Sequence, residues 1–304
     1  MKVLITGGAG FIGSSFVHLL NKHNSGHKGF EIIVVDKLTY ASNLERIPPN
    51  VEFIEKDICD LTKEDIGDVQ YIVNFAAESH VDNSIDDGNP FIQTNINGTY
   101  NLVELARKMK TFYKFVQIST DEVYGDLNDT GSHKKMSLEG DVCKPSSYYS
   151  ASKSSADQIV ISAGRTFELP YVITRSCNNY GKFQHKEKFL PKVMDCISNN
   201  QVVPVYGDGS QIREWIWVED NVNIIFDLML SDIGIWNIGT GDRYTNKEIL
   251  RNIGGIINYP VKFEFIQDRM GHDRRYGLDC TKLRDRFDFD PTINLMEYLR
   301  TELL

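Results

Sequence analysis

Short apolar runs alternate with helical patterns along the first 175 residues. The apolar runs predict six strands, at residues 2–5, 31–36, 51–55, 71–77, 114–119 and 171–175. Between them, apolar residues at helical spacing predict helices, chiefly one to about residue 20, one at 90–110 and one at 148–167. Strands that alternate with helices predict an α/β fold built on a doubly wound parallel sheet with right-handed crossovers. The polar, turn-rich stretch 128–144 predicts a surface loop.

The pattern changes after Arg175. Shorter elements follow, which we predict as helices to about residue 198, at 222–230 and at 246–257, and strands at 202–206, 235–238 and 262–266. The apolar run at 235–238 is expected to return to the first sheet. We therefore predict a Rossmann domain at 1–175, joined by roughly 211–240, and a smaller α/β substrate lobe at 176–304.

A glycine-rich turn follows the first strand directly. Its sequence, T-G-G-A-G-F-I-G, has glycines at positions 7, 10 and 13 and leads into a helix. Such a turn lets the backbone approach a pyrophosphate, which the helix N-terminus attracts. Asp36 ends the second strand, where a carboxylate binds the ribose of NAD and repels the 2′-phosphate of NADP. The adjacent Lys37 argues the other way, so NAD is favoured but a structural glycine turn stays an alternative.

Polar side chains follow the fifth predicted strand, and a tyrosine–lysine pair opens the next helix. Thr120, Asp121 and Glu122 stand at the strand's carboxyl end, where ligands of open α/β sheets bind. Tyr149 and Lys153 are four residues apart and share one helix face. A lysine ammonium beside a phenol lowers the phenol's pKa, which would make Tyr149 a general base. A solvent-facing pair is the alternative.

Other polar residues have two interpretations each. Asp57 is predicted either to accept a hydrogen bond from an adenine amino group or to cap the short helix near Thr62. His80 alone is more typical of a structural hydrogen-bonding residue than of a catalyst. The charged segment 268–275 is either a solvated loop or, with Lys188 and Arg213, a diphosphate site.

Composition narrows the classes of partner. The chain has 304 residues and a formal net charge of −9, which argues against a nucleic-acid or anionic-membrane surface as its main partner. No apolar run approaches the ~20 residues of a membrane span, and the chain enters a strand without a leader pattern. Five cysteines without metal-ligand spacing indicate reduced thiols, no metal site and a cytoplasmic protein.

These motifs together resemble one enzyme family. The segments T-G-G-A-G-F-I-G-S, A-A-E-S-H-V-D, I-S-T-D-E-V-Y-G, S-A-S-K, V-Y-G-D-G-S-Q-I-R and G-H-D-R-R-Y are similar to extended short-chain dehydrogenases/reductases, specifically the nucleotide-sugar 4,6-dehydratases. The matching segments span nearly the whole chain. The acid pair after Thr120 separates these enzymes from epimerases of the same fold, which usually lack it.

The resemblance implies a reaction and roles for named residues. It implies NAD-dependent dehydration of a nucleoside-diphosphate hexose to the 4-keto-6-deoxy sugar, with dTDP-glucose the favoured substrate and UDP-glucose an alternative. Tyr149, with Lys153 and Thr120, would take the 4-OH proton. Glu122 would remove the C5 proton, and Asp121 would protonate the departing 6-OH. NAD would stay tightly bound and be regenerated in each turnover.

Further residues are predicted to contact each ligand. The cofactor-binding set is Gly7, Gly10, Phe11, Ile12, Gly13, Asp36, Lys37, Asp57, Ile58, Ala76, Ala77, Ser79, Thr94, Tyr149, Lys153 and Asn179. The substrate-binding set is His80, Thr120, Asn178, Glu187, Lys188, Tyr206, Arg213, Asn246 and His272. The resemblance also implies a homodimer formed by the helices at 90–110 and 148–167.

The sequence also departs from the family, and other functions stay open. Met270, Lys182, Lys186 and Tyr148 stand where other residues are usual, mainly near the expected sugar-nucleotide pocket. A 4-epimerase or a uridine-diphosphate-glucuronate decarboxylase needs the tyrosine and NAD but not Asp121 and Glu122 together. A catalytically silent NAD-binding regulator is the alternative of another class.

Overall fold

A seven-stranded parallel sheet forms the centre of the molecule. The structure, a computed structural model, describes residues 1–24, 29–127 and 135–304. The strand order is β10-β6-β5-β4-β1-β2-β3, which confirms the doubly wound parallel sheet. The strand bounds are β1 (Lys2–Thr6), β2 (Glu31–Asp36), β3 (Glu52–Glu55), β4 (Tyr71–Asn74), β5 (Lys114–Thr120), β6 (Tyr171–Ser176) and β10 (Gly234–Ile238).

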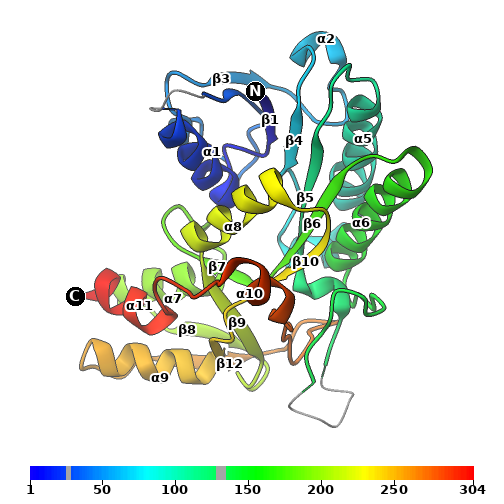
Figure 1. Cartoon of the computed structure of the whole chain (residues 1–304). Helices are drawn as coiled ribbons and strands as arrows, with labels where there is room; N and C mark the ends of the chain where they lie inside the picture. Colours follow the sequence, from blue (N-terminus) through cyan, green and yellow to red (C-terminus); the bar gives the residue numbers. More distant parts are fainter. Residues whose placement is uncertain (25–28, 128–134) are drawn as a thin grey trace.

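Helices cover both faces of this sheet, so its central strands are buried, whereas the edge strand β3 is partly exposed. One face carries α1 (Phe11–His23) and α8 (Val218–Ser231), which pack against each other (Figure 1). The other face carries α2 (Lys63–Ile66), α5 (Thr99–Arg107) and α6 (Tyr148–Phe167). As predicted, the strand near residue 235 returns to the sheet, where β10 pairs with β6.

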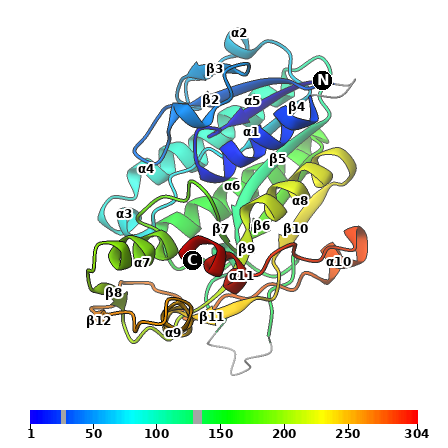
Figure 2. The ribbon, with the colours of Figure 1, turned by 90° about the vertical axis from the view of Figure 1, so that its left-hand side faces the viewer.

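The remaining C-terminal elements form a smaller lobe with its own apolar cluster. It contains a three-stranded sheet of β7 (Asn178–Tyr180), β9 (Ile212–Trp217) and β11 (Arg243–Thr245), and a pair, β8 (Val203–Tyr206) and β12 (Phe263–Ile266). The helices α7 (Phe189–Ser198), α9 (Asn246–Ile256) and α11 (Leu295–Leu303) pack around these strands (Figure 2). The helix α10 (Thr281–Phe287) instead packs against β10. The division of the chain near residue 175 stays a prediction.

Two predicted elements differ from the structure. The strand at 71–77 ends at Asn74, so Ala76 and Ala77 lie in the loop beyond it. The helix at 90–110 is three pieces: α4 (Asn89–Phe91), a π-helical segment, η2 (Ile92–Gly98), and α5. In η2, the buried Asn95 accepts a hydrogen bond from the Glu78 amide and donates to the Glu78 carbonyl. Apolar spacing cannot reveal this wide turn, which coincides with a polar contact to a distant loop.

The predicted loop at 128–144 is described only from residue 135, and 128–134 lie outside the described residues. In the described part, Ser137 is buried and pairs with Leu278, so this segment is attached to the C-terminal part of the chain. No helix in residues 1–24, 29–127 and 135–304 is long and apolar enough to cross a membrane.

Candidate active site

A cavity opens at the carboxyl ends of β1, β2, β4, β5 and β6, where a parallel sheet presents its ligand site. All of the predicted cofactor-binding residues line it, and so do Thr120, Asp121, Glu122, Asn178 and Lys188. Further lining residues were not predicted: Val35, Thr39, Ala41, Ser42, Lys56, Phe75, Glu78, Ile118, Ser119, Ser176, Cys177, Gln184 and His185. Most of these lie at the end of a strand or in the loop that follows it, so position in the fold is the signal that would have found them.

The glycine turn is packed too tightly for side chains. Gly7 has φ +67°, and a Cβ added to it would lie 2.5 Å from the Ala76 amide nitrogen. A Cβ on Gly13 would lie 2.2 Å from the Gly7 carbonyl oxygen. Helix α1 begins directly after Gly10, which has no side chain to cap its first turn. The first-turn amides and the positive end of the helix dipole therefore suit an anion such as a pyrophosphate.

The Asp36 carboxylate is buried at the end of β2 and fixed by three donors. Its Oδ1 accepts from the Leu38 amide at 2.9 Å and the Ser42 hydroxyl at 3.0 Å, and its Oδ2 from the Ala9 amide at 3.0 Å. A carboxylate has about four acceptor positions, so one remains for a ligand hydroxyl. This geometry fits a ribose diol and would repel a phosphate.

The position of Lys37 in the sequence favoured NADP, but its contacts in the structure do not. Its ammonium donates to the Thr94 hydroxyl at 2.9 Å and lies 3.3 Å from the Asp57 carboxylate and 3.6 Å from that of Glu78. Two neighbouring acids already compensate its charge, so Lys37 adds little attraction for a 2′-phosphate.

The Asp57 carboxylate accepts from the Cys59 amide at 2.9 Å. Burial raises its pKa, but this hydrogen bond and the Lys37 charge outweigh burial and lower the pKa overall. The prediction that Asp57 caps the helix near Thr62 is wrong, because Thr62 and Asp65 cap α2 through reciprocal hydrogen bonds.

The two carboxyl groups after β5 have different environments. Asp121 is buried, and burial, followed by the Glu122 charge, raises its pKa well above the usual range. Burial also raises the pKa of Glu122, but Arg269, Arg213 and Lys188 oppose that shift. Of these three cations, Arg213 also acts on Asp121, and a carboxyl near one cation keeps its proton more easily than a carboxyl near three. Asp121 therefore suits a proton donor and Glu122 a proton acceptor.

The environment of Tyr149 differs from the sequence-based prediction. Burial, followed by the Glu122 charge, raises its pKa, and the hydrogen bond with Thr120 opposes this. The predicted net lowering of the Tyr149 pKa is wrong for the protein alone, because burial and the Glu122 charge outweigh the opposing effects. The Lys153 ammonium donates to the Ile118 carbonyl at 2.5 Å. Burial lowers the pKa of Lys153 itself to about 8. Both residues nevertheless line the cavity beside Thr120.

The predicted substrate residues divide between the cavity and the smaller lobe. Thr120, Asn178 and Lys188 line the cavity, and Lys188 donates to the Ser79 carbonyl at 2.8 Å. The other predicted residues do not line it: His80, Glu187, Tyr206, Arg213, Asn246 and His272. His80 and Glu187 lie 3.6 Å apart. The His80 Nδ1 is buried and has no hydrogen-bond partner in the described part of the chain.

The charged segment 268–275 is partly buried, so the prediction of a simple solvated loop is wrong. His272 contacts Asp268 at 2.6 Å, and its ring lies edge-on to Tyr206. Burial, followed by the Arg269 charge, lowers the pKa of His272 to about 4. Arg269 lies 3.5 Å from Asp82, which also accepts from the Tyr206 hydroxyl at 3.0 Å. Met270, by contrast, is 76% exposed.

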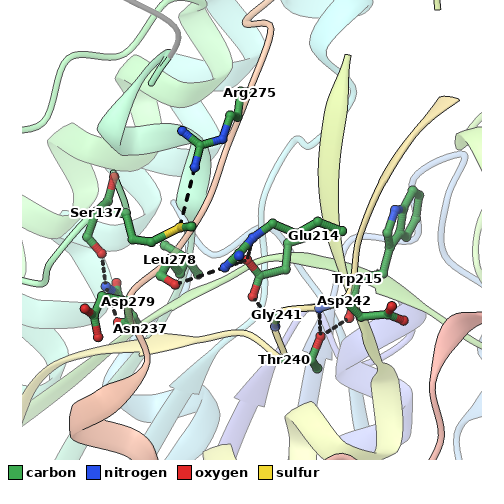
Figure 3. A network of polar contacts seen from close by, with 12 residues as sticks. Ser137, Glu214, Trp215, Asn237, Thr240, Gly241, Asp242, Arg275, Leu278 and Asp279 are labelled. Atoms are coloured by element: carbon green, nitrogen blue, oxygen red, sulfur yellow. Dashed lines mark hydrogen bonds and ion pairs between the residues drawn. The ribbon is translucent and has the colours of Figure 1, made fainter. Parts of the chain in front are cut away.

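Strand β9 places Arg213 close enough to Glu122 to influence its pKa, and a buried network fixes the strand. Arg213 donates to the Asp273 carbonyl at 2.9 Å, and its guanidinium lies over the Tyr276 ring. Side chains alternate along a strand, so the next residue, Glu214, points the other way. Glu214 lies 2.6 Å from Arg243 and accepts from the Gly241 amide at 2.8 Å. Figure 3 shows Glu214 beside Gly241. Asn246, one residue beyond β11, begins α9, and its amide donates to the Gln211 carbonyl.

Sequence reasoning also missed residues behind the cavity. Asn95 links the loop after β4 to α6, because it donates to the Ser152 hydroxyl at 2.8 Å. Asp157 and Arg175 form a buried ion pair at 3.0 Å. Asn, Asp and Arg within predicted helices and strands are usually solvent-facing, so only their burial distinguishes these three.

Comparisons with known proteins place the chain among related enzymes. Residues 3–239 match the NAD dependent epimerase/dehydratase family. The chain is 44% identical to the low-salt glycan biosynthesis protein Agl12 of Haloferax volcanii, over 93% of this chain and 92% of that protein. It is 38% identical to the dTDP-glucose 4,6-dehydratase of Haemophilus influenzae, over 99% and 96%.

Solved structures of dehydratases and epimerases have the same fold as this chain. The dTDP-glucose 4,6-dehydratase DesIV of Streptomyces venezuelae, with NAD and dTDP bound, superposes with a TM-score of 0.92 at 35% identity, covering 100% of this chain and 96% of that one. The UDP-glucose 4-epimerase of Thermus thermophilus in complex with NAD gives 0.90 at 26%, covering 99% and 97%.

Proposed function

Because the chain belongs to the NAD-dependent epimerase/dehydratase family, we propose that it is a nucleotide-sugar 4,6-dehydratase. Its substrate would be a nucleoside-diphosphate hexose, with dTDP-glucose favoured over UDP-glucose. The observation that carries this proposal is the adjacent pair Asp121 and Glu122, which line the cavity with Tyr149 and differ in the cations that act on them.

The cavity fits NAD by its own geometry. The glycine turn and the uncapped start of α1 would hold the pyrophosphate, and the remaining acceptor position of Asp36 would hold the adenosine ribose. Ala76 and Ala77 leave room for a flat ring system. The chemistry that NAD supplies when bound is acceptance of a hydride and its later return.

Tyr149 and Thr120 would move the first proton. The phenol, hydrogen-bonded with Thr120, would take the proton of the sugar 4-OH as C4 is oxidised. Lys153, one helical turn away, would favour the phenolate by its charge. Burial and the Glu122 charge raise the phenol's pKa in the protein alone, and the charge of Lys153 would have to offset this increase.

The acid pair would then eliminate water. The 4-ketone acidifies the C5 proton, which Glu122 would remove while protonated Asp121 gives its proton to the departing 6-OH. General acids and bases typically contribute about 10²–10⁴-fold each, so both should be required for useful rates. With the hydride returned to C6, reprotonation of C5 by Tyr149 or solvent would complete the 4-keto-6-deoxy product.

Cations of the smaller lobe would bind the substrate diphosphate. Lys188, Arg213 and Arg269 all act electrostatically on Glu122, so their charges converge beside the reacting carboxylates. Arginine and lysine are suited to phosphate oxygens. Other predicted substrate residues would contribute hydrogen-bonding contacts: His80, Asn178, Glu187, Tyr206, Asn246 and His272.

Mass spectrometry tests this function directly. The purified protein is incubated without added NAD, separately with dTDP-glucose and UDP-glucose, and in a further sample with UDP-glucuronate. Loss of one water from either substrate would support the proposal, and the faster substrate would identify the nucleotide. A changed but isomeric sugar would indicate a 4-epimerase instead, and loss of carbon dioxide from UDP-glucuronate a decarboxylase. If all substrates stay unchanged with NAD added, the dehydratase assignment fails and a binding-only protein is favoured.

We propose further that the protein is cytoplasmic and that its cofactor and substrate lobes divide near residue 175.

We also propose that the protein is a homodimer. The support for the dimer is a group of exposed apolar side chains on η2, α5 and α6: Ile92, Tyr100, Tyr148 and Phe167. Burying them against a second copy would remove this apolar area from water. Light scattering at micromolar concentration should give twice the 34.7 kDa chain mass. The monomer mass would contradict the dimer.

A further inference from the structure

A buried carboxylate lies behind the proposed catalytic residues and has no role in the proton steps above. Asp157 follows Tyr149 and Lys153 on α6 at successive steps of four residues, so the three share a helix face. It is fully buried. Its Oδ2 accepts from the Ser119 hydroxyl at 3.1 Å and from the Arg175 Nε at 3.0 Å. Its Oδ1 is buried without a hydrogen-bond partner in the described residues.

Lys153 needs an opposite charge to remain protonated. It is 4% exposed, and burial lowers its pKa to about 8, while the Asp157 charge acts in the other direction. Its hydrogen bond to the Ile118 carbonyl places a dipole, not a charge, against the ammonium. Asp157 is therefore what limits the loss of the Lys153 proton near neutral pH.

Arg175 fixes the Asp157 carboxylate from the neighbouring strand β6. Its guanidinium lies over the Tyr124 ring at 4.8 Å and approaches the Glu139 carbonyl at 3.5 Å. The Tyr124 hydroxyl donates to Asn237, so the ring is held as well. Three further ionisable groups act on residues of this row. Asp121 and Glu122 act on Tyr149, and Cys143 acts on Arg175.

We propose that Asp157 is a positioning residue for the reaction: it is the counter-ion that keeps Lys153 protonated, while Ser119 and Arg175 hold its carboxylate in place. The Asp157 charge also acts directly on Tyr149 and raises its pKa, so any support of phenolate formation comes through the charge of Lys153, without contact between Asp157 and substrate. This consequence for catalysis rests on the proposed dehydratase function. The statement about the Lys153 charge does not.

The direct test measures the Lys153 pKa in the full-length protein labelled with ¹³Cε-lysine. Its NMR signal is identified by its absence in Lys153→Met. In Asp157→Asn we expect the Lys153 pKa to fall by about one unit or more, because removing a nearby opposite charge shifts a pKa by about one to three units. Asp220→Asn is the matched control: Asp220 is another buried carboxylate, held by two hydrogen bonds from Thr292. It should leave the Lys153 pKa unchanged.

A kinetic test follows the same charge through the reaction. In the wild-type protein, formation of NADH from bound NAD and a nucleotide sugar should fall at high pH as Lys153 loses its proton. We expect Asp157→Asn to move this fall to lower pH and to reduce the rate on the alkaline side by about tenfold, as a one-unit pKa shift requires. Asp157→Glu, which keeps the charge, should restore part of the wild-type profile. A merely structural role would lower the melting temperature without shifting the profile.

The outcomes separate this inference from the proposed function. An unchanged Lys153 pKa in Asp157→Asn would overturn the inference, whatever the activity. A second outcome is a lowered Lys153 pKa in Asp157→Asn together with a wild-type protein that dehydrates no sugar. This result would support the inference and contradict the proposed function. If Asp157→Asn does not fold, the double variant Asp157→Asn/Arg175→Met is measured in its place. It replaces both partners of the buried ion pair by uncharged side chains, a change that proteins often tolerate. The Lys153 pKa should fall in that variant too, because Asp157 is the charge that acts on Lys153.

Discussion

Replacing Glu122 by Gln is the sharpest test of the acid–base assignment. The change keeps the size of the side chain and removes only its charge and its ability to accept a proton. The Glu122 charge raises the pKa of both Asp121 and Tyr149, so its loss should lower both values. The first oxidation needs Tyr149 to lose its proton and should therefore be preserved, whereas elimination loses its base.

The expected loss can be estimated. A general base typically contributes about 10²–10⁴-fold, equivalent to about 3–5 kcal/mol of activation free energy. Lys188, Arg213 and Arg269 remain in place, so substrate should still bind. The reaction should then stop after oxidation, and NADH should accumulate on the enzyme in place of the transient signal expected from the wild-type protein.

Stopped-flow absorbance of NADH and mass spectrometry of the product measure the two stages separately. Glu219→Gln is the control, because Glu219 lies on α8, outside the cavity lining, and burial raises its pKa as well. It should leave both stages unchanged. Water loss at the wild-type rate in Glu122→Gln would refute the assignment of Glu122 as the base. Loss of NADH formation as well would show that Glu122 is needed before elimination.

Three further substitutions test other parts of the site. Tyr149→Phe should prevent NADH formation while NAD stays bound, and oxidation at the wild-type rate would exclude Tyr149 as the base. Gly13→Val should purify without NAD, because even its Cβ would lie 2.2 Å from the Gly7 carbonyl oxygen; Gly140→Ala, with open space around it, is the control, and retained cofactor would contradict the packing argument. Asp121→Asn should abolish dehydration and change the pH dependence of stability. Because the pKa of Asp121 is raised in the folded protein, the wild type loses stability as pH rises through that pKa. The variant lacks this loss, so its melting temperature minus that of the wild type should be larger at about pH 9 than at about pH 5. An equal difference at both pH values would exclude a protonated Asp121.

The cofactor half of the site could be predicted from the sequence because its signals are local. The glycines of the first turn, Asp36 after the second strand and Thr120 after the fifth each stand beside a strand that the apolar pattern identifies. Parallel strands all end at one edge of the sheet, so position in the sequence determines position in the site. This is why the whole predicted cofactor set lines one cavity.

Charge compensation depended on the tertiary structure. Lys37 follows Asp36 in the sequence, but its ammonium contacts acids from two other loops. The prediction for the Tyr149 pKa was wrong because helix spacing describes only which residues are near, not how deeply they are buried. Burial acts on an ionisable group through all the atoms around it, and these come from distant parts of the chain.

The sequence by itself determined the fold class, the nucleotide turn and the identity of the chemical groups, because these follow from apolar periodicity and from residues close together in the chain. The tertiary structure decided which carboxyl is the better acid, which charges converge on Glu122, and that Asp157 and Arg175 support Lys153. The physical reason is that protonation depends on burial and on charges brought together by folding, such as Arg213 of β9 with Glu122 and Asp157 of α6 with Lys153. The spacing of residues along the chain does not determine how far apart these charged groups lie in the folded protein.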